Sequence, residues 1–265
     1  MLVKALHPTV LGHEVMIDDH IEFIQPPADN LFWRYMDLSK FFPPVHTSKL
    51  YFARVDRMED AFESALPDLE AEKIHDYFHL PEVQNDDRVK RAGEFKTMYG
   101  TMRIKLYLSC LHMSDKESTA MWRLSRDSNE GIATCTTLKM MKSALADSPE
   151  VPFATEVQYL DYQKDQFKQR SQGSPTPNAF LLILNKRKSF EHEREVRITW
   201  WNMMAANKPY KNYAGIEYGK AVANDLTKLL LWVMVSPVAG AWFKDIVSAA
   251  LKVYPGSPSS LISCH

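Results

Sequence analysis

Glycine is scarce in this sequence: there are 9 in 265 residues, and no two of them are adjacent. No segment has the pattern of a Walker phosphate loop or of the G-x-G-x-x-G turn of dinucleotide-binding folds. The G-x-S-x-G nucleophile elbow and the H-E-x-x-H zinc helix are missing as well. These absences exclude several large enzyme classes, and they mean that a bound nucleotide would not be held on a glycine cradle.

Cysteine and net charge are also limited. Cys110, Cys135 and Cys264 are isolated and odd in number, which argues against a disulfide framework and against a zinc site of paired thiolates. Lys and Arg total 32 against 33 Asp and Glu, so a net charge of -1 gives no overall attraction to nucleic acid or acidic membrane.

No apolar run approaches the roughly 20 residues that span a bilayer, and the N-terminal residues do not have the pattern of a signal peptide. We expect a cytoplasmic protein without a membrane partner.

What is present favours one sizeable folded unit. Hydrophobic residues make up 45% of the chain, which is ample material for a core. We expect residues 1–30 to form an N-terminal extension and residues 31–265 to form a single domain. The fold class that we expect is α+β, with mixed, mainly antiparallel sheets flanked by helices.

Two early predicted strands, at residues 31–36 and 50–55, each carry an arginine inside an aromatic or apolar run. These are Arg34 and Arg54. Burying a guanidinium alone is costly, so each one either pairs with a carboxylate of the fold or contacts an anion. The sequence leaves both alternatives open for each arginine.

Other local signals place a helix after the first strand and a central strand later. Asp37 can cap a short helix over residues 38–42, which Pro43 and Pro44 are expected to end. Residues 104–111 have the length and composition of a central strand. Residues 114–117 have capping-box spacing and predict a helix at residues 118–126.

Residues 189–201 concentrate three carboxylates and two guanidiniums in a segment that ends in strand-forming residues. If residues 190–200 are extended, Glu191, Glu193, Glu195, Arg197 and Thr199 share one face. Glu193 and Glu195 would then lie in one cleft, and their repulsion would raise one pKa unless Arg197 or a ligand cation offsets it.

An alternative for the same stretch is a long helix from residue 178 to 197, with Glu191 and Glu195 four residues apart on a solvated face. The β-branched and aromatic residues at 196–201 favour the strand instead, preceded by a helix at residues 180–188.

A series of different short motifs is distributed through most of residues 31–262. They are FWRYM at 32–36, KLYFAR at 49–54, EDAFE at 59–63, SCLH at 109–112, AMW at 120–122, EGI at 130–132, E-x-E-x-R within 190–197, and VSP at 235–237 before Trp242 and Phe243. In order and spacing they resemble the bacterial family known as domain of unknown function 2971. That resemblance implies no activity.

An early strand with an Arg and an aromatic, then a helix, a strand of the Lys-Leu-Tyr-Phe type and a late strand that begins at a Glu, is also distantly similar to ADP-ribosyltransferases. This resemblance implies that Arg34 helps to hold NAD, that Tyr35 or Tyr51 packs on the nicotinamide, and that Glu195 binds the ribose and stabilises an oxocarbenium-like transition state. Glu193 matches an extra acid, and Ser109 stands where a Ser-Thr-Ser triplet is missing. The predicted site has Glu193 and Glu195 as catalytic acids and, around NAD, Arg34, Tyr35, Tyr51, Arg54, Ser109, Trp122 and Arg197.

The leading hypothesis is an NAD-dependent ADP-ribosyltransferase-like enzyme with an unknown macromolecular acceptor, either protein or nucleic acid. A second is a metal-dependent phosphoesterase or nuclease in which Asp60, Glu63, Glu193 and Glu195 gather around Mg²⁺ or Mn²⁺. A third is a binding module without catalysis, in which the E-x-E-x-R acids and Arg34 form a buried ion-pair lattice and Trp122 belongs to the core.

Overall fold

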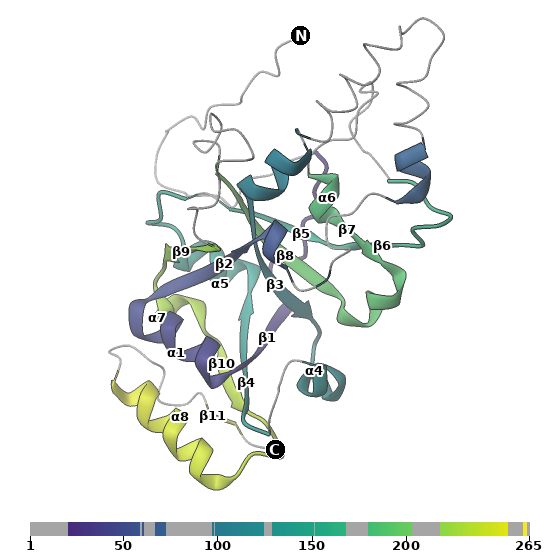
Figure 1. Cartoon of the computed structure of the whole chain (residues 1–265). Coiled ribbons are helices and arrows are strands. Elements are labelled where there is room, and N and C mark those ends of the chain that lie inside the picture. The colour runs from purple at the N-terminus through teal and green to yellow at the C-terminus, as the bar shows by residue number, and fades with distance from the viewer. Residues whose placement is uncertain are drawn as a thin grey trace, which may run out of the picture.

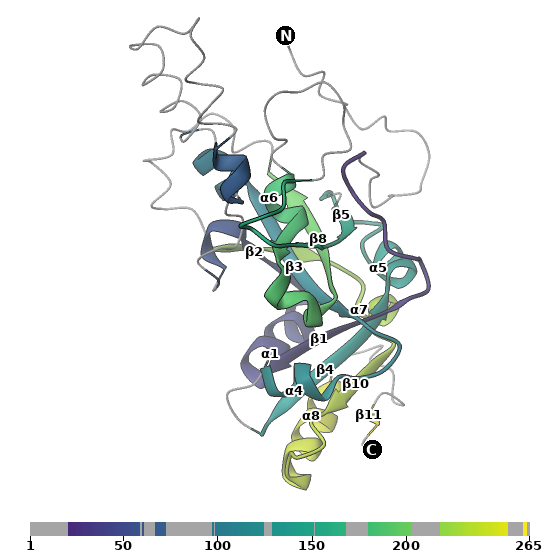
Figure 2. The ribbon, with the colours of Figure 1, turned by 90° about the vertical axis from the view of Figure 1, so that its right-hand side faces the viewer.

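The computed structural model describes residues 21–58, 60, 67–72, 97, 99–124, 129–150, 152–167, 180–202, 218–253 and 262–263. In this part of the chain helices flank a mixed, mainly antiparallel sheet, which confirms the expected α+β class (Figures 1 and 2). None of the helices described is long and apolar enough to cross a membrane.

The main sheet has nine strands in the part of the chain that the structure describes. Its continuous path runs through β11 (Ile262–Ser263), β10 (Trp232–Val235), β4 (Gly131–Thr137), β1 (Leu31–Asp37), β3 (Leu106–Met113), β2 (Lys49–Arg54) and β9 (Gly219–Ala223). On the other edge of β3 lie β8 (Glu195–Trp201) and then β5 (Phe153–Glu156). A separate two-stranded sheet pairs β6 (Gln158–Leu160) with β7 (Asn185–Arg187).

The sheet splits beside the middle of β3, because two different strands share one of its edges. β1 pairs with the end of β3 through Phe32 and Trp33, while β2 pairs near its start through Ala53 and Arg54. Neither pairing covers residues 109–111 of β3. β8 runs along the opposite edge of β3 from Leu106 to His112 and holds the two halves together.

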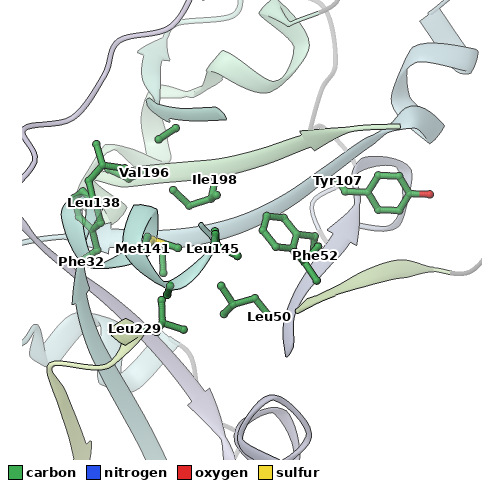
Figure 3. Packing of buried hydrophobic residues seen from close by; sticks show 14 residues of the cluster. Phe32, Leu50, Phe52, Tyr107, Leu138, Met141, Leu145, Val196, Ile198 and Leu229 are labelled. Atoms are coloured by element: carbon green, nitrogen blue, oxygen red, sulfur yellow. The ribbon is translucent and has the colours of Figure 1, made fainter. Parts of the chain in front are cut away.

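Helices cover both faces of the sheet. On one face lie α1 (Leu38–Thr47), α5 (Leu138–Ala144), α7 (Leu226–Leu229) and α8 (Ala241–Val253), and on the other lie α4 (Thr119–Leu124) and α6 (Leu181–Leu184). Figure 1 shows α1 and α4 on opposite sides of β1. The largest buried cluster packs α5 and α7 against β2, β3 and β8, with Met141, Leu145 and Leu229 facing Leu50 and Ile198 (Figure 3).

The helix after β1 begins as predicted and ends later than predicted. Asp37 caps α1, since its side chain accepts a hydrogen bond from the backbone N–H of Lys40 at 2.8 Å. The expectation that Pro43 and Pro44 end the helix was wrong, because α1 continues to Thr47. Phe41 and Val45 are buried against the sheet, and this packing holds the helix together through the two prolines.

The acidic stretch is only partly a strand. Residues 188–193 form a 3-10 helix, η2 (Lys188–Glu193), and Arg194 adopts a left-handed conformation with φ 41° before β8 begins at Glu195. The predicted strand therefore holds from Glu195 onward, and the predicted helix at residues 180–188 is limited to α6, followed by β7. From Glu195 the alternation is as expected, with Val196 and Ile198 in the core on the opposite face.

The described end of the N-terminal extension, residues 21–30, packs on the domain. Phe23 is 3% exposed and contacts the rings of Phe153 and Phe180 at about 5 Å between centroids. Ile24 donates its backbone N–H to Thr155 and accepts one from Glu156. These residues complete the core next to β5 and α6.

Candidate functional site

A cavity of about 310 Å³ opens where the sheet splits. It is bounded by one segment of β1, one of β3, the η2 and β7 region, and α4. The residues that line it are Trp33, Arg34, Tyr35, Met36, Lys40, Met58, Cys110, Leu111, His112, Met121, Leu124, Lys186, Glu193 and Glu195. The cavity therefore brings together four of the predicted site residues: Arg34, Tyr35, Glu193 and Glu195.

Arg34 reaches this cavity from the opposite face of the sheet to Glu195. Its neighbours Phe32 and Met36 pack on the face of α1 and α5, whereas Tyr35 faces α4. The guanidinium Nη1 donates to Ser109 Oγ at 3.2 Å across the split, and no carboxylate of the described residues pairs with it. Arg34 thus borders the cavity where β1 and β3 separate.

Glu195 is held by two cations. Arg197 Nε donates to Glu195 Oε1 at 2.8 Å and Arg197 Nη2 to Oε2 at 3.3 Å, while Lys186 Nζ lies 3.0 Å from Oε2. The thiol of Cys110 also lowers the pKa of this carboxylate. The backbone N–H of Glu195 donates to the hydroxyl of Tyr159 at 2.7 Å, which fixes the start of β8.

These contacts decide the charge of Glu195. Burial opposes its ionisation, but the charge and hydrogen bonds of Arg197, together with the charge of Lys186, lower the pKa of Glu195 to about 2. A carboxylate offers about four lone-pair positions, and Arg197 and Lys186 already place three donors on them. Glu195 is therefore an ionised, buried group with little capacity left for a ligand hydroxyl.

Glu193 is the more available acid. Its side chain is 22% exposed, compared with 5% for Glu195, and it pairs with Lys186 Nζ at 2.6 Å. Lys186 therefore bridges the two carboxylates, in the position that the sequence assigned to Arg197 or a ligand cation. The predicted shared cleft exists, although Glu193 enters it from η2 rather than from a strand.

Two aromatic rings border the cavity beside these acids. Nδ1 of His112 donates to the backbone carbonyl of Glu193 at 2.5 Å, and burial lowers the pKa of His112, so the ring is neutral near pH 7. The hydroxyl of Tyr35 accepts the backbone N–H of Ser118 at 2.7 Å, and its ring meets Trp122 edge-on at 5.0 Å. Burial raises the pKa of Tyr35 to about 12, so it also remains neutral.

The other predicted site residues lie elsewhere in the described structure. Tyr51 is on β2 and is 41% exposed, and Arg54 is buried against Asp56 with Nε 2.6 Å from Oδ1. Trp122 is 4% exposed and donates to Glu117, as expected of a core residue. Arg197 is fully buried behind Glu195 and donates to the carbonyl of Ile183 at 2.7 Å. Ser109 faces α1 and holds Arg34.

Sequence reasoning missed three groups that shape the site: Lys186, Tyr159 and the thiol of Cys110, which lowers the pKa of Glu195. Lys186 comes from β7 and Tyr159 from β6, and these two strands, which are distant in the sequence, form a short parallel pair beside η2. No hydrophobic periodicity in the sequence of residues 158–187 indicates that β6 pairs with β7. The nearest available signal was the expected need for a cation beside Glu193 and Glu195.

The residues named for a metal centre are dispersed or outside the described residues. Asp60 accepts hydrogen bonds from Arg187 at 3.2 and 3.3 Å, and Glu63 lies outside the described part. Among the residues that the structure describes, no group of three or more His, Cys, Asp or Glu side chains is placed to hold a metal ion.

Comparison of the sequence with protein-family models finds no match, and comparisons with curated proteins and with solved structures find no significant similarity. The functional argument therefore depends on the geometry of this cavity.

Proposed function

We propose that this chain is an ADP-ribosyltransferase-like enzyme that binds NAD in the cavity at the split of the sheet. The observation that carries the proposal is that one cavity of about 310 Å³ is bordered by Arg34 and Tyr35 on β1 and by Glu193 and Glu195 across it. This is the set of groups that the distant family resemblance assigns to NAD.

Cavity size and residue chemistry suit one end of such a substrate. Ligand pockets commonly measure about 300–1,000 Å³, so this one would enclose the nicotinamide riboside end, with the remainder of NAD extending outward. Tyr35 and the apolar side chains of Met121 and Leu124 offer surface for a flat ring. Lys40 and Arg34 offer positive charge for the pyrophosphate.

The two acids have different roles in this proposal. In the reaction the bond between C1′ of the ribose and the nicotinamide nitrogen breaks, nicotinamide leaves with the electron pair, and the acceptor forms a bond to C1′. Positive charge develops on the ribose, and a preorganised carboxylate stabilises it. Glu193, with one strong partner, meets the ribose or takes the acceptor's proton, while Glu195 holds Lys186 and thereby positions Glu193.

Calorimetry with NAD, together with measurement of nicotinamide release, tests this proposal. We expect the wild type to bind NAD, and we expect Glu193→Gln to retain binding while releasing nicotinamide about 10²–10³ times more slowly. Glu191→Gln, an exposed change in the same 3-10 helix, is the matched control and should match the wild type. Absence of NAD binding by the wild type, or undiminished release by Glu193→Gln, would rule the proposal out.

A second candidate is a binding module without catalysis, and the ion pairs of Glu195 favour it. An acid that accepts from Arg197 and Lys186 is typical of a structural lattice as well as of an active site. Arg34 takes no part in that lattice, contrary to the version expected from the sequence. This candidate would be favoured if the protein binds NAD but releases no nicotinamide in any of the conditions tested.

A further inference from the structure

A second cavity, of about 50 Å³, lies on the other face of the sheet, between the strands and α1, α5 and α7. Most of its wall is aliphatic or aromatic. The apolar residues that line it are Met36, Phe41, Pro44, Val45, Leu50, Leu111, Met141, Leu226, Leu229 and Leu230. Three of them, Leu50, Met141 and Leu229, are visible in Figure 3 and come from three separate elements.

The polar residues of this wall, Arg34, Ser109, Thr134 and Thr136, all belong to the sheet. Arg34 lies directly opposite Thr134 in the pairing of β1 with β4, so their side chains are neighbours on one face. Ser109, on the other side of Arg34, accepts its Nη1 at 3.2 Å. Among the described residues, the hydroxyl of Thr134 makes no hydrogen bond and the side chain of Arg34 makes one, to Ser109.

Such an arrangement suits an anion with a hydrocarbon tail. A guanidinium has five N–H donors, and the bond to Ser109 leaves most of those of Arg34 available to an anion in the cavity. Arg34 is half-buried, and desolvation lowers its pKa. Apolar walls, in contrast, favour an apolar occupant over water. The polar group and the apolar walls therefore select opposite ends of one amphiphilic molecule.

We infer that this cavity binds a short-chain aliphatic carboxylate, with the carboxylate on Arg34, Ser109 and Thr134 and the chain between α1 and α7. A volume of about 50 Å³ has room for about four water-sized spheres at ~10–15 Å³ each, which limits the tail to a few carbons. The carboxylate site lies on the opposite face of the sheet to Glu193 and Glu195, but Arg34 borders both cavities. Thr134 and Leu229 line the smaller cavity and not the larger one, so their variants distinguish this inference from the proposed function.

Sodium butyrate is the probe, with n-butanol and sodium chloride as controls for the tail and for ionic strength. Binding is followed by thermal denaturation and by saturation transfer to the butyrate methyl protons in NMR. We expect a saturable rise in the melting temperature with butyrate, a weaker effect with acetate, and none with butanol or chloride. An equal effect of butanol and butyrate, or no saturable effect of butyrate, would overturn the inference.

Variants locate the site. Arg34→Gln and Thr134→Val each remove one polar contact, whereas Leu229→Phe fills the cavity without changing its charge. We expect Arg34→Gln to weaken butyrate binding about 10- to 100-fold. We expect Leu229→Phe to abolish butyrate binding. Lys40→Gln is the matched control, because Lys40 is a cation that lines only the larger cavity. Should Arg34→Gln fail to fold, Thr134→Val and Leu229→Phe decide, and wild-type affinity in both would contradict the inference.

Discussion

Arg197 holds the carboxylate of Glu195 with two hydrogen bonds, of 2.8 and 3.3 Å, from the same face of β8. Both side chains are buried, Arg197 completely. Breaking a buried ion pair by removing one partner leaves an uncompensated charge in the interior, which costs far more than an exposed pair. This ion pair predicts that the main role of Glu195 is to stabilise the folded state.

Glu195→Gln should lower the free energy of unfolding by about 3–5 kcal/mol, because it leaves Arg197 and Lys186 without their shared anion. Chemical denaturation followed by circular dichroism measures the loss. Glu191→Gln is the control and should stay within about 0.5 kcal/mol of the wild type, since Glu191 is exposed. If Glu195→Gln is as stable as the control, the carboxylate is not the structural anchor inferred above.

The same carboxylate predicts a pH dependence of stability. Glu195 stays ionised in the folded state down to a pKa of about 2, whereas in the unfolded chain a glutamate takes up a proton below about pH 4.5. Between these values the unfolded state binds more protons, so the stabilisation is complete above about pH 4.5 and is lost as the pH falls toward 2. Subtracting the profile of Glu195→Gln from that of the wild type should isolate this loss, and parallel profiles would contradict it.

The close approach of β9 to β2 predicts a third result. A Cβ atom on Gly219 would lie 2.5 Å from the carbonyl oxygen of Phe52 and closer still to the ring of Tyr51. Gly219→Ala should therefore cost about 1–3 kcal/mol through displacement of the edge strand. At Gly240 a Cβ meets only the side chain of Trp242, which is 55% exposed and free to move aside, so Gly240→Ala should cost less than about 1 kcal/mol. Equal losses of stability in Gly219→Ala and Gly240→Ala would contradict the inference that the close approach of β9 to β2 requires a glycine at position 219.

Local sequence signals predicted the helices and strands whose conformation depends mainly on residues close together in the sequence. The strand at β1, the cap at Asp37 and the central strand at β3 follow from composition and side-chain chemistry near each residue. The helix at α4 was also predicted, but its cap was misplaced: the backbone N–H of Met121 donates to Ser118 Oγ, and Glu117 accepts from Trp122 instead of closing a capping box. Sequence spacing located that helix without identifying its cap.

Side-chain partners that depend on how the strands pair escaped prediction. The two arginines looked alike in sequence, yet Arg54 pairs with Asp56 two residues away and Arg34 pairs with no described carboxylate. The difference arises from the split between β1 and β2, which no local pattern encodes. The acidic stretch was recognised as a shared cleft, but its bridging cation, Lys186, depends on how β7 pairs with β6. The family resemblances remain predictions.

Lys186 provides the last prediction, because its ammonium group lies 2.6 Å from Glu193 and 3.0 Å from Glu195. Lys186→Met should destabilise the fold less than Glu195→Gln, since Arg197 still compensates Glu195. In double-mutant cycles, Lys186→Met combined with Glu193→Gln or with Glu195→Gln should show coupling energies of about 0.5–3 kcal/mol. Lys186→Met with Glu191→Gln is the control cycle and should be additive within about 0.5 kcal/mol. Additivity in all three cycles would mean that Lys186 does not link the two acids, and Glu193 would then lack the positioning that the proposed chemistry requires.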